Sequence, residues 1–469
     1  MKTLDGQALA KSRVHSSLQL DMVPAHWEVR RLRTVLQGVT ERDRPELPLL
    51  SVVREQGVIL RDLSGQSQNR NFVPDDLSNY KVVREGQFAI NKMKAWQGSY
   101  GVSEHDGIVS PAYHVYSVED VTGDYFHVAI RSRAYVPQFA AASDGVRVGQ
   151  WDLSPSRMRQ IPFLIPSKPE QVAIVRFLRH VEERIRRYIR AKERLTELLE
   201  EQKQAIIHQA VTGQIDVRTG KPYAAYTDSG VEWLGEVPEH WSVRRNRWLF
   251  RERNETGFGS LPILEVSLRD GVRIRDIKSG QRKQQIVDRD RYKRAKEHDV
   301  AYNTMRMWQG AVGAVPVDGL VSPAYVVITP VERMESGYFG YLFRTEAYKN
   351  AVKTYSRGIV SDRDRLYWDA FKRIASFVPP LEEQIAIVGF LDDLTGQTDR
   401  LVRTTEKLMG WLTEWKESVI CHVVTGKLDV RAAAASFPEC GPVNANDTLI
   451  EDPGADLEAP QTDHPTSQP

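Results

Sequence analysis

The feature that most constrains this chain is a tandem repeat, because most of the sequence is written twice with a period near 213 residues. The matching segments keep their order and drift by only a residue or two. They are VPAHWEVRRLRTVL at 23–36 with VPEHWSVRRNRWLF at 237–250, LPLLSVVREQGVILRD at 47–62 with LPILEVSLRDGVRIRD at 261–276, NKMKAWQGSYG at 91–101 with NTMRMWQGAVG at 303–313, VSPAY at 109–113 and 321–325, PEQVAIVRFL at 169–178 with LEEQIAIVGFL at 381–391, and VTGQIDVR at 211–218 with VTGKLDVR at 424–431. Solenoids repeat every 20–50 residues or so in at least three copies, so this period predicts duplication of a whole structural unit.

Each copy has two parts of different character. The first part mixes short runs of Val, Ile, Phe and Tyr with Gly, Pro, Asp and Asn, which predicts strands and turns in a mixed α/β globule. The second part contains no proline over roughly residues 170–210 and 383–423 and has helical periodicity. The predicted boundaries are an N-terminal segment at 1–22, globules at 23–166 and 237–379, helical spacers at 167–213 and 380–426, a linker at 214–236 and a tail at 427–469.

The two helical parts carry heptad series typical of a coiled-coil seam, with apolar residues at alternating spacings of four and three. We expect packing at Ile174, Leu178, Val181, Ile185, Leu195 and Leu199 in the first copy, and at Ile387, Leu391, Leu394, Leu401, Leu408 and Leu412 in the second. Lys192, Thr398 and Thr405 interrupt the seam and leave room for other subunits.

A helix of about 40 residues is roughly 60 Å long and is not stable alone in water, so its apolar stripe needs a partner. The simplest partner is the matching helix of the other copy. The sequence therefore predicts an α+β fold: two similar mixed α/β globules separated by two long antiparallel coiled-coil helices, with pseudo-twofold symmetry. The alternative is that each helix folds onto its own globule.

Composition limits the class of protein further. Residues 432–469 hold seven Asp or Glu, six Pro and no Lys or Arg, which predicts a disordered acidic tail. Without that tail the balance is 64 basic against 62 − 7 = 55 acidic residues, or +9, a bias that permits nucleic-acid binding. Two cysteines exclude a disulfide framework, and the absence of long apolar runs or a signal-like start predicts a cytoplasmic location.

Catalytic motifs are missing. No GxxxxGK[ST] phosphate loop, HExxH, paired CxxC or GxSxG elbow occurs, and Pro74-Asp75-Asp76 lacks a following Glu-x-Lys of a metal-dependent nuclease. No methyl-transfer site of the Asn-Pro-Pro-Tyr type is present, since SPAY at 110–113 and 322–325 differs from it in polarity. We therefore expect no catalytic residues, no metal ligands and no activity of the isolated chain.

Taken together, these features resemble the specificity subunit of a type I restriction-modification system, over about residues 23–430. WLGEVPEHW at 233–241 is similar to the motif that begins the family's recognition domains, and the first copy has only VPAHW at 23–27. A Pro-x-x-Glu-Gln start of a long helix is also family-like. It occurs as Pro380, Glu383 and Gln384, and in altered form as Pro166 or Pro169 before Glu170 and Gln171.

The resemblance implies a function and a set of partners. Each globule would recognise one half of a bipartite site in double-stranded DNA, and the helices would set the gap between the halves. Two methyltransferase subunits would dock on the helices and flip the target adenine, and restriction subunits would join them. S-adenosylmethionine, ATP and magnesium would be bound by those partners and not by this chain.

Candidate DNA contacts are polar residues near aromatic and glycine positions, because Arg or Lys can pair with guanine and Gln or Asn with adenine. The candidates are Asn91, Lys92, Lys94, Trp96 and Gln97 in one copy, with Asn303, Arg306, Trp308 and Gln309 in the other, and Thr304 matching Lys92. A second loop adds Arg147, in 143–147, and Arg357, in 356–360. The alternative is that Trp96, Trp308, Met93 and Met305 belong to the core and that the arginines are ordinary surface residues.

The likeness of the globules suggests related half-sites and a partly palindromic target, although Lys92 differs from Thr304 and Arg147 from Val360. Two other functions remain open from the sequence: a coiled-coil scaffold without a DNA role, and a self-sufficient restriction or modification enzyme.

Overall fold

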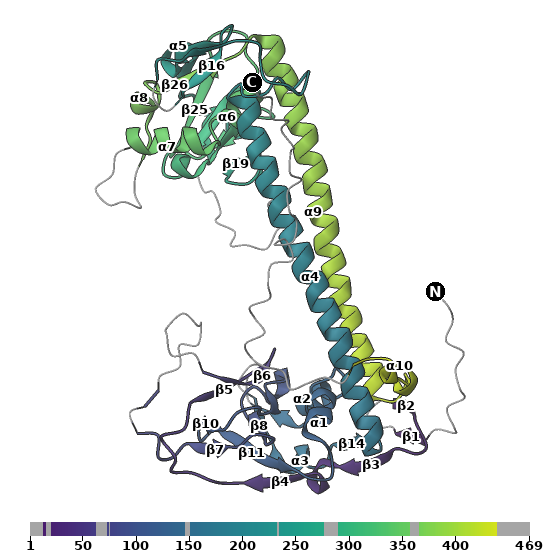
Figure 1. Cartoon of the computed structure of the whole chain (residues 1–469). Helices are drawn as coiled ribbons and strands as arrows, with labels where there is room; N and C mark the ends of the chain where they lie inside the picture. Colours follow the sequence, from purple (N-terminus) through teal and green to yellow (C-terminus); the bar gives the residue numbers. More distant parts are fainter. Residues whose placement is uncertain are drawn as a thin grey trace, which may run out of the picture. The chain divides into compact units, whose positions relative to one another are not determined.

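The structure is a computed structural model that describes residues 13–15, 20–61, 73–74, 76–145, 151–231, 234–275, 289–356 and 365–438. The chain divides into two compact units: a first unit of Met1–Arg190 with Leu408–Pro469, and a second unit of Ala191–Lys407. Each unit holds one globule and a part of each of two 44-residue helices, α4 (Lys168–Val211) and α9 (Leu381–Val424) (Figure 1).

The first globule is built on a four-stranded antiparallel sheet in the order β4-β11-β8-β9. Its strands are β4 (Leu36–Val39), β11 (Tyr113–Val118), β8 (Phe88–Asn91) and β9 (Tyr100–Val102). Antiparallel pairs flank it: β3 (Glu28–Arg31) with β14 (Pro162–Ile165), β5 (Leu50–Val53) with β6 (Gly57–Leu60), β7 (Lys81–Val83) with β10 (Gly107–Val109), and β12 (Ser143–Asp144) with β13 (Asp152–Leu153). A further pair, β1 (Arg13–His15) with β2 (Leu20–Val23), lies near the N-terminus.

The second globule repeats the four-stranded sheet and most of its flanking pairs, although no pair among its described residues corresponds to β12 with β13. Its four-stranded sheet has the order β18-β25-β22-β23, formed by β18 (Phe250–Arg253), β25 (Tyr325–Pro330), β22 (Val300–Asn303) and β23 (Val312–Ala314). The flanking pairs are β17 (Ser242–Arg245) with β26 (Ala375–Val378), β19 (Leu264–Ser267) with β20 (Gly271–Ile274), and β21 (Lys293–Ala295) with β24 (Gly319–Val321). The remaining pair is β15 (Tyr226–Asp228) with β16 (Glu236–Pro238). The structural duplication predicted from the repeat is therefore confirmed.

Short helices cover the sheets. In the first unit they are α1 (Gly123–Ile130), α2 (Val136–Ala141), α3 (Pro155–Met158), α10 (Arg431–Ala435) and the 3-10 turns η2 (Leu32–Thr34) and η3 (Ala95–Gln97). In the second they are α5 (Asn246–Leu249), α6 (Ser336–Leu342), α7 (Glu346–Tyr355), α8 (Trp368–Phe371), η4 (Arg289–Arg291) and η5 (Met307–Gln309).

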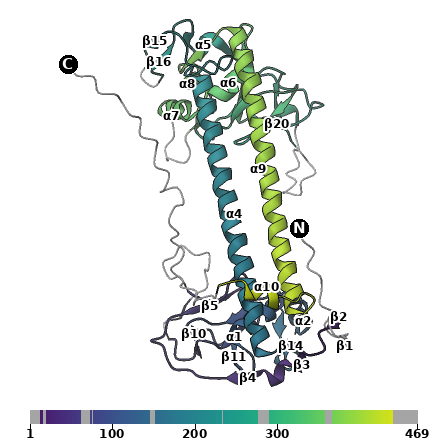
Figure 2. The ribbon, with the colours of Figure 1, turned by 45° about the vertical axis from the view of Figure 1, so that its right-hand side comes forward.

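The long helices join the cores of both globules by their ends. In the first unit, Ile174 and Leu178 near the start of α4 share a buried cluster with Val423 and Val424 at the end of α9. In the second unit, the end of α4 is buried with the start of α9 in the other globule's core. The helices therefore run antiparallel in each unit, and Figure 2 shows them side by side.

Glycine ends both long helices in the same way. Gly213 and Gly426 have φ angles of +76° and +72°, the left-handed conformation that commonly terminates a helix. A Cβ on Gly213 would lie 2.5 Å from Cδ of Pro238, and one on Gly426 would collide with Pro24. The Val-Thr-Gly and Val-Pro segments of the repeat are thus two halves of one close contact, made once in each unit.

We predict that Gly213→Ala destabilises the chain by about 2–4 kcal/mol, because the substitution adds a strained φ to a steric overlap with a buried proline. Urea denaturation followed by circular dichroism measures the loss. Gly389→Ala is the matched control: Gly389 is helical with nothing within 4 Å of its added Cβ, so the midpoint should stay or rise. Equal midpoints for both variants would contradict the proposed role of the contact.

Glu383 at the start of α9 fastens that helix to the second globule and to the segment after α4. Its carboxylate, 6% exposed, accepts hydrogen bonds from Tyr223 Oη (3.1 Å), His240 Nε2 (2.8 Å) and Trp241 Nε1 (2.9 Å). Arg218 Nη2 lies 3.2 Å away and completes the group. Burial raises the pKa of Glu383, but the hydrogen bonds from Trp241, His240 and Tyr223 outweigh it and hold the pKa below its usual range.

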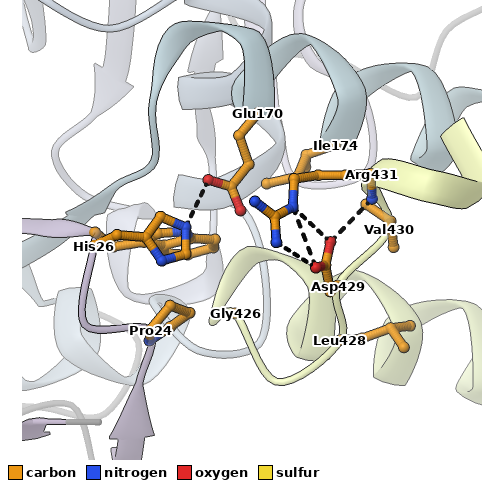
Figure 3. A pocket seen from close by; sticks show the side chains of 10 residues that line it. Pro24, His26, Glu170, Ile174, Gly426, Leu428, Asp429, Val430 and Arg431 are labelled. Atoms are coloured by element: carbon orange, nitrogen blue, oxygen red, sulfur yellow. Dashed lines mark hydrogen bonds and ion pairs between the residues drawn. The ribbon is translucent and has the colours of Figure 1, made fainter. Parts of the chain in front are cut away.

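The first unit has a reduced version of this group around Glu170, shown in Figure 3. His26 Nε2 lies 3.1 Å from the Glu170 carboxylate, while Arg431 pairs with Asp429 at 2.6 Å instead. Trp27 Nε1 is buried and has no hydrogen-bond partner among the described residues. The position of Tyr223 is held by Ser436, so this joint has fewer polar contacts than its counterpart.

We predict that Glu383→Gln lowers the stability of the chain at pH 7 by about 2–3 kcal/mol, since an amide cannot accept from all these donors. The folded-state pKa lies below the ordinary 4.5, so the stabilisation exists above that pH and is lost as pH falls through the lowered pKa. The difference between wild type and variant, measured by urea denaturation, should therefore shrink in acid. The exposed neighbour Glu382, changed to Gln, serves as control. A difference independent of pH would contradict a role for the charge.

The seam between α4 and α9 follows the heptad series at most positions and departs from it at Leu195 and Leu401. Of the predicted positions, Ile174, Leu178, Ile185, Ile387 and Leu391 are buried, Val181, Leu199, Leu394, Leu408 and Leu412 are half-buried, and Leu195 and Leu401 are 36% and 46% exposed. Val402, 4% exposed, takes the seam position that the series assigns to Leu401, while Thr398 and Thr405 are buried in the seam.

Lysines enter the seam at equivalent places in the two units. Lys203 is 8% exposed and contacts Glu200 at 2.7 Å and Asp399 of the other helix at 3.3 Å. Lys416 lies 3.6 Å from Glu182.

Candidate functional site

Each globule presents the same polar turn after a central strand of its sheet. In the first, Asn91 ends β8 and its Oδ1 accepts from Met93 N at 3.1 Å; in the second, Asn303 ends β22 and accepts from Met305 N at 3.0 Å. Asn91 Nδ2 also donates to Tyr113 Oη at 3.3 Å. Both asparagines, predicted as DNA contacts, thus use their side chains to shape the turn.

In each turn an exposed cationic residue comes directly before a buried apolar residue. Ala95 and Met307 are fully buried, whereas Lys94 and Arg306, one residue earlier, are exposed and have no ion-pair partner among the described residues. Gly98 and Gly310, with φ of +95° and +90°, return the chain to the next strand. Met93 and Met305 are 52% and 44% exposed and lie outside the core.

The two tryptophans are half-buried and lie beside the turn in different surroundings. Trp96 packs on Trp151 with ring centroids 5.3 Å apart. Trp308 Nε1 donates to Met305 O at 3.0 Å, and Lys353 Nζ lies 5.8 Å from its ring centroid. These contacts hold both indoles against their own globules, so they support the turn and leave an edge exposed.

Lys92 and its counterpart Thr304 differ in charge and in exposure. Lys92 Nζ pairs with Asp152 at 3.1 Å on the surface, whereas Thr304 is 5% exposed and donates to Ala324 O at 2.9 Å. Gln97 is half-buried and Gln309 exposed. Arg147 and Arg357 lie outside the described residues.

Sequence reasoning missed a second pair of lysines beside the turns. Lys81 Nζ donates to Tyr113 O at 2.6 Å, and Lys293 Nζ to Tyr325 O at 3.0 Å. Burial, with Arg42 and Lys92 nearby, lowers the pKa of Lys81, and burial with Lys81 and Lys92 lowers that of His114. Lys81 is therefore a second cation beside the first turn. The recurrence of lysine at matching places in the two copies could have pointed to it.

Solved structures provide the comparison that decides the fold. A chain from a study of complex assembly and conformational transition of the type I restriction-modification system superposes with a TM-score of 0.62 and 15% identity, covering 87% of this chain and 99% of that one. The HsdS subunit from Thermoanaerobacter tengcongensis gives a TM-score of 0.51 and 16% identity, covering 87% and 98%. No protein-family model and no curated protein sequence matches the chain.

The chain has the fold of a type I specificity subunit. The predicted fold class is confirmed by this match and by the two long helices packed together. Within the specificity-subunit fold, the described part of the chain contains no group of three or more His, Cys, Asp or Glu placed to hold a metal ion. None of its described helices is long and apolar enough to cross a membrane.

Proposed function

We propose that the chain is the DNA-recognition subunit of a type I restriction-modification complex. Each globule recognises one half of a bipartite site in double-stranded DNA, and the paired helices set the gap and dock two methyltransferase subunits, which restriction subunits join in the cytoplasm. The chain itself is non-catalytic, and S-adenosylmethionine, ATP and magnesium are bound by the partner subunits. The specificity-subunit fold supports this proposal.

The observation that carries the DNA part is the matched pair of turns. Each places an exposed cation, Lys94 or Arg306, on a glycine-closed loop whose backbone is fixed by asparagine, and neither cation has an ion-pair partner in the described part of the chain. Contacts of this kind bind phosphates or guanine edges, and a fixed backbone makes them directional. Two copies in one chain suit a target with two parts.

We predict that Lys94→Ala and Arg306→Ala each weaken DNA binding by about 1–3 kcal/mol, each at one half-site only. The full chain is first used to select duplexes from a random-sequence library, and hydroxyl-radical footprints on the selected duplex then locate the loss. Wild-type affinity should fall as salt rises. A wild-type chain that selects no bipartite sequence would refute the proposed function, and footprints reduced equally at both halves would refute the assignment of the residues.

The docking part is supported by apolar side chains that the helix pair leaves uncovered. Trp411 and Trp415 on α9 are 66% and 54% exposed, and Tyr188 and Leu198 on α4 are 43% and 45% exposed. Large aromatic residues in this setting are typical anchors of protein interfaces.

We predict that the double variant Trp411→Glu, Trp415→Glu reduces methyltransferase binding at least tenfold, because it buries two charges in an apolar contact. Co-purification from cells that express both subunits, followed by titration calorimetry, measures the effect. Thr413→Glu, exposed on the same helix between the two tryptophans, should bind as wild type. Unchanged binding of the double variant would place the methyltransferase elsewhere.

A further inference from the structure

The two globules differ in charge at a position that the backbone places beside each turn. In the first globule, Leu153 N donates to Lys92 O at 2.9 Å, and in the second, Leu366 N donates to Thr304 O at 2.9 Å. These equivalent hydrogen bonds bring the residue before each leucine to the same place. That residue is Asp152 in the first globule and Arg365 in the second.

The exchange changes the local charge in a defined way. In the first globule Asp152 neutralises Lys92, so Lys92, Asp152 and Lys94 sum to 1 − 1 + 1 = +1. In the second, Thr304 is uncharged and buried, so Arg365 and Arg306 sum to +2.

Arg365 is also positioned for an anionic ligand. It is exposed, no carboxylate of the described residues pairs with it, and its Nη1 donates to Tyr367 Oη at 3.2 Å. Tyr367 is itself 54% exposed, so its hydroxyl stands beside the guanidinium as a second polar group. A guanidinium supported from one side keeps its remaining donors directed at solvent, which suits a phosphate oxygen.

We infer that Arg365 binds a DNA backbone phosphate at the half-site of the second globule. The first globule lacks this contact, because the carboxylate of Asp152 stands at the matching position and repels a phosphate. The inference rests on the proposed function and adds to it a difference between the two globules in how they bind DNA. The second globule binds its half-site with one more cation than the first, whatever bases the two globules recognise.

Reciprocal exchange of the two residues tests this. On the duplex selected by the wild-type chain, Arg365→Asp should weaken binding about tenfold and reduce the slope of log affinity against log salt by about one. Its footprint should weaken at the half-site that Arg306→Ala also affects. Asp152→Arg should strengthen binding and increase the slope, a gain that misfolding cannot produce.

Two further variants define the contact. Arg365→Lys should keep the affinity within about twofold and select the same sequence, because a phosphate accepts either cation. Arg333→Asp, an exposed arginine beyond the opposite end of β25, controls for the loss of net charge and should change affinity much less.

The outcomes separate this inference from the proposed function. A wild-type chain without salt-dependent, sequence-selective binding refutes the proposed function before any variant is made. Normal wild-type binding with unchanged slopes for Arg365→Asp and Asp152→Arg overturns the inference alone. A new base preference in Arg365→Lys would overturn the phosphate assignment.

Discussion

The architecture depends on the burial of each long helix's end in the globule that the other copy encodes. Val211 at the end of α4 lies in the second core, and Val424 at the end of α9 lies in the first. Neither copy can complete its core alone, because the missing apolar groups are at the far end of the other copy's helix. The glycine–proline contacts and the Glu383 group hold these ends in place.

The helix pair buries only part of its own apolar surface. Its seam buries threonines, Val402 and the stem of Lys203, while tryptophans and leucines with a greater apolar area stay outside. Burying such side chains contributes about 2 kcal/mol each, so a seam that omits them forgoes considerable stability. Binding of a third helix or another subunit would bury these side chains and recover that stability. For this reason we assign the exposed apolar side chains of α4 and α9 to the proposed interface with other subunits.

Much of the fold could be predicted from the sequence, because the tandem repeat shows which segments of the chain should share one structure. The strand order of one globule reappears in the other, and both helices start and end at equivalent residues. The site is less accessible to such reasoning. Asn91 and Asn303 have side chains that can pair with bases, but in this fold they hold the turn. Lys81 was not predicted, although lysine recurs at the matching position 293. The heptad series places Leu401 in the seam where the structure buries Val402, because both residues are apolar and tertiary packing chooses between them.

Covalent duplication has a consequence for how such a molecule can change. In a dimer of identical chains every mutation changes both subunits, because one gene encodes both. Here the first globule has Asp152 where the second has Arg365, and an equivalent backbone hydrogen bond holds the chain beside each residue. In a single chain that holds both copies, a mutation changes one globule and leaves the other as it was, so the surfaces of the two globules can diverge independently.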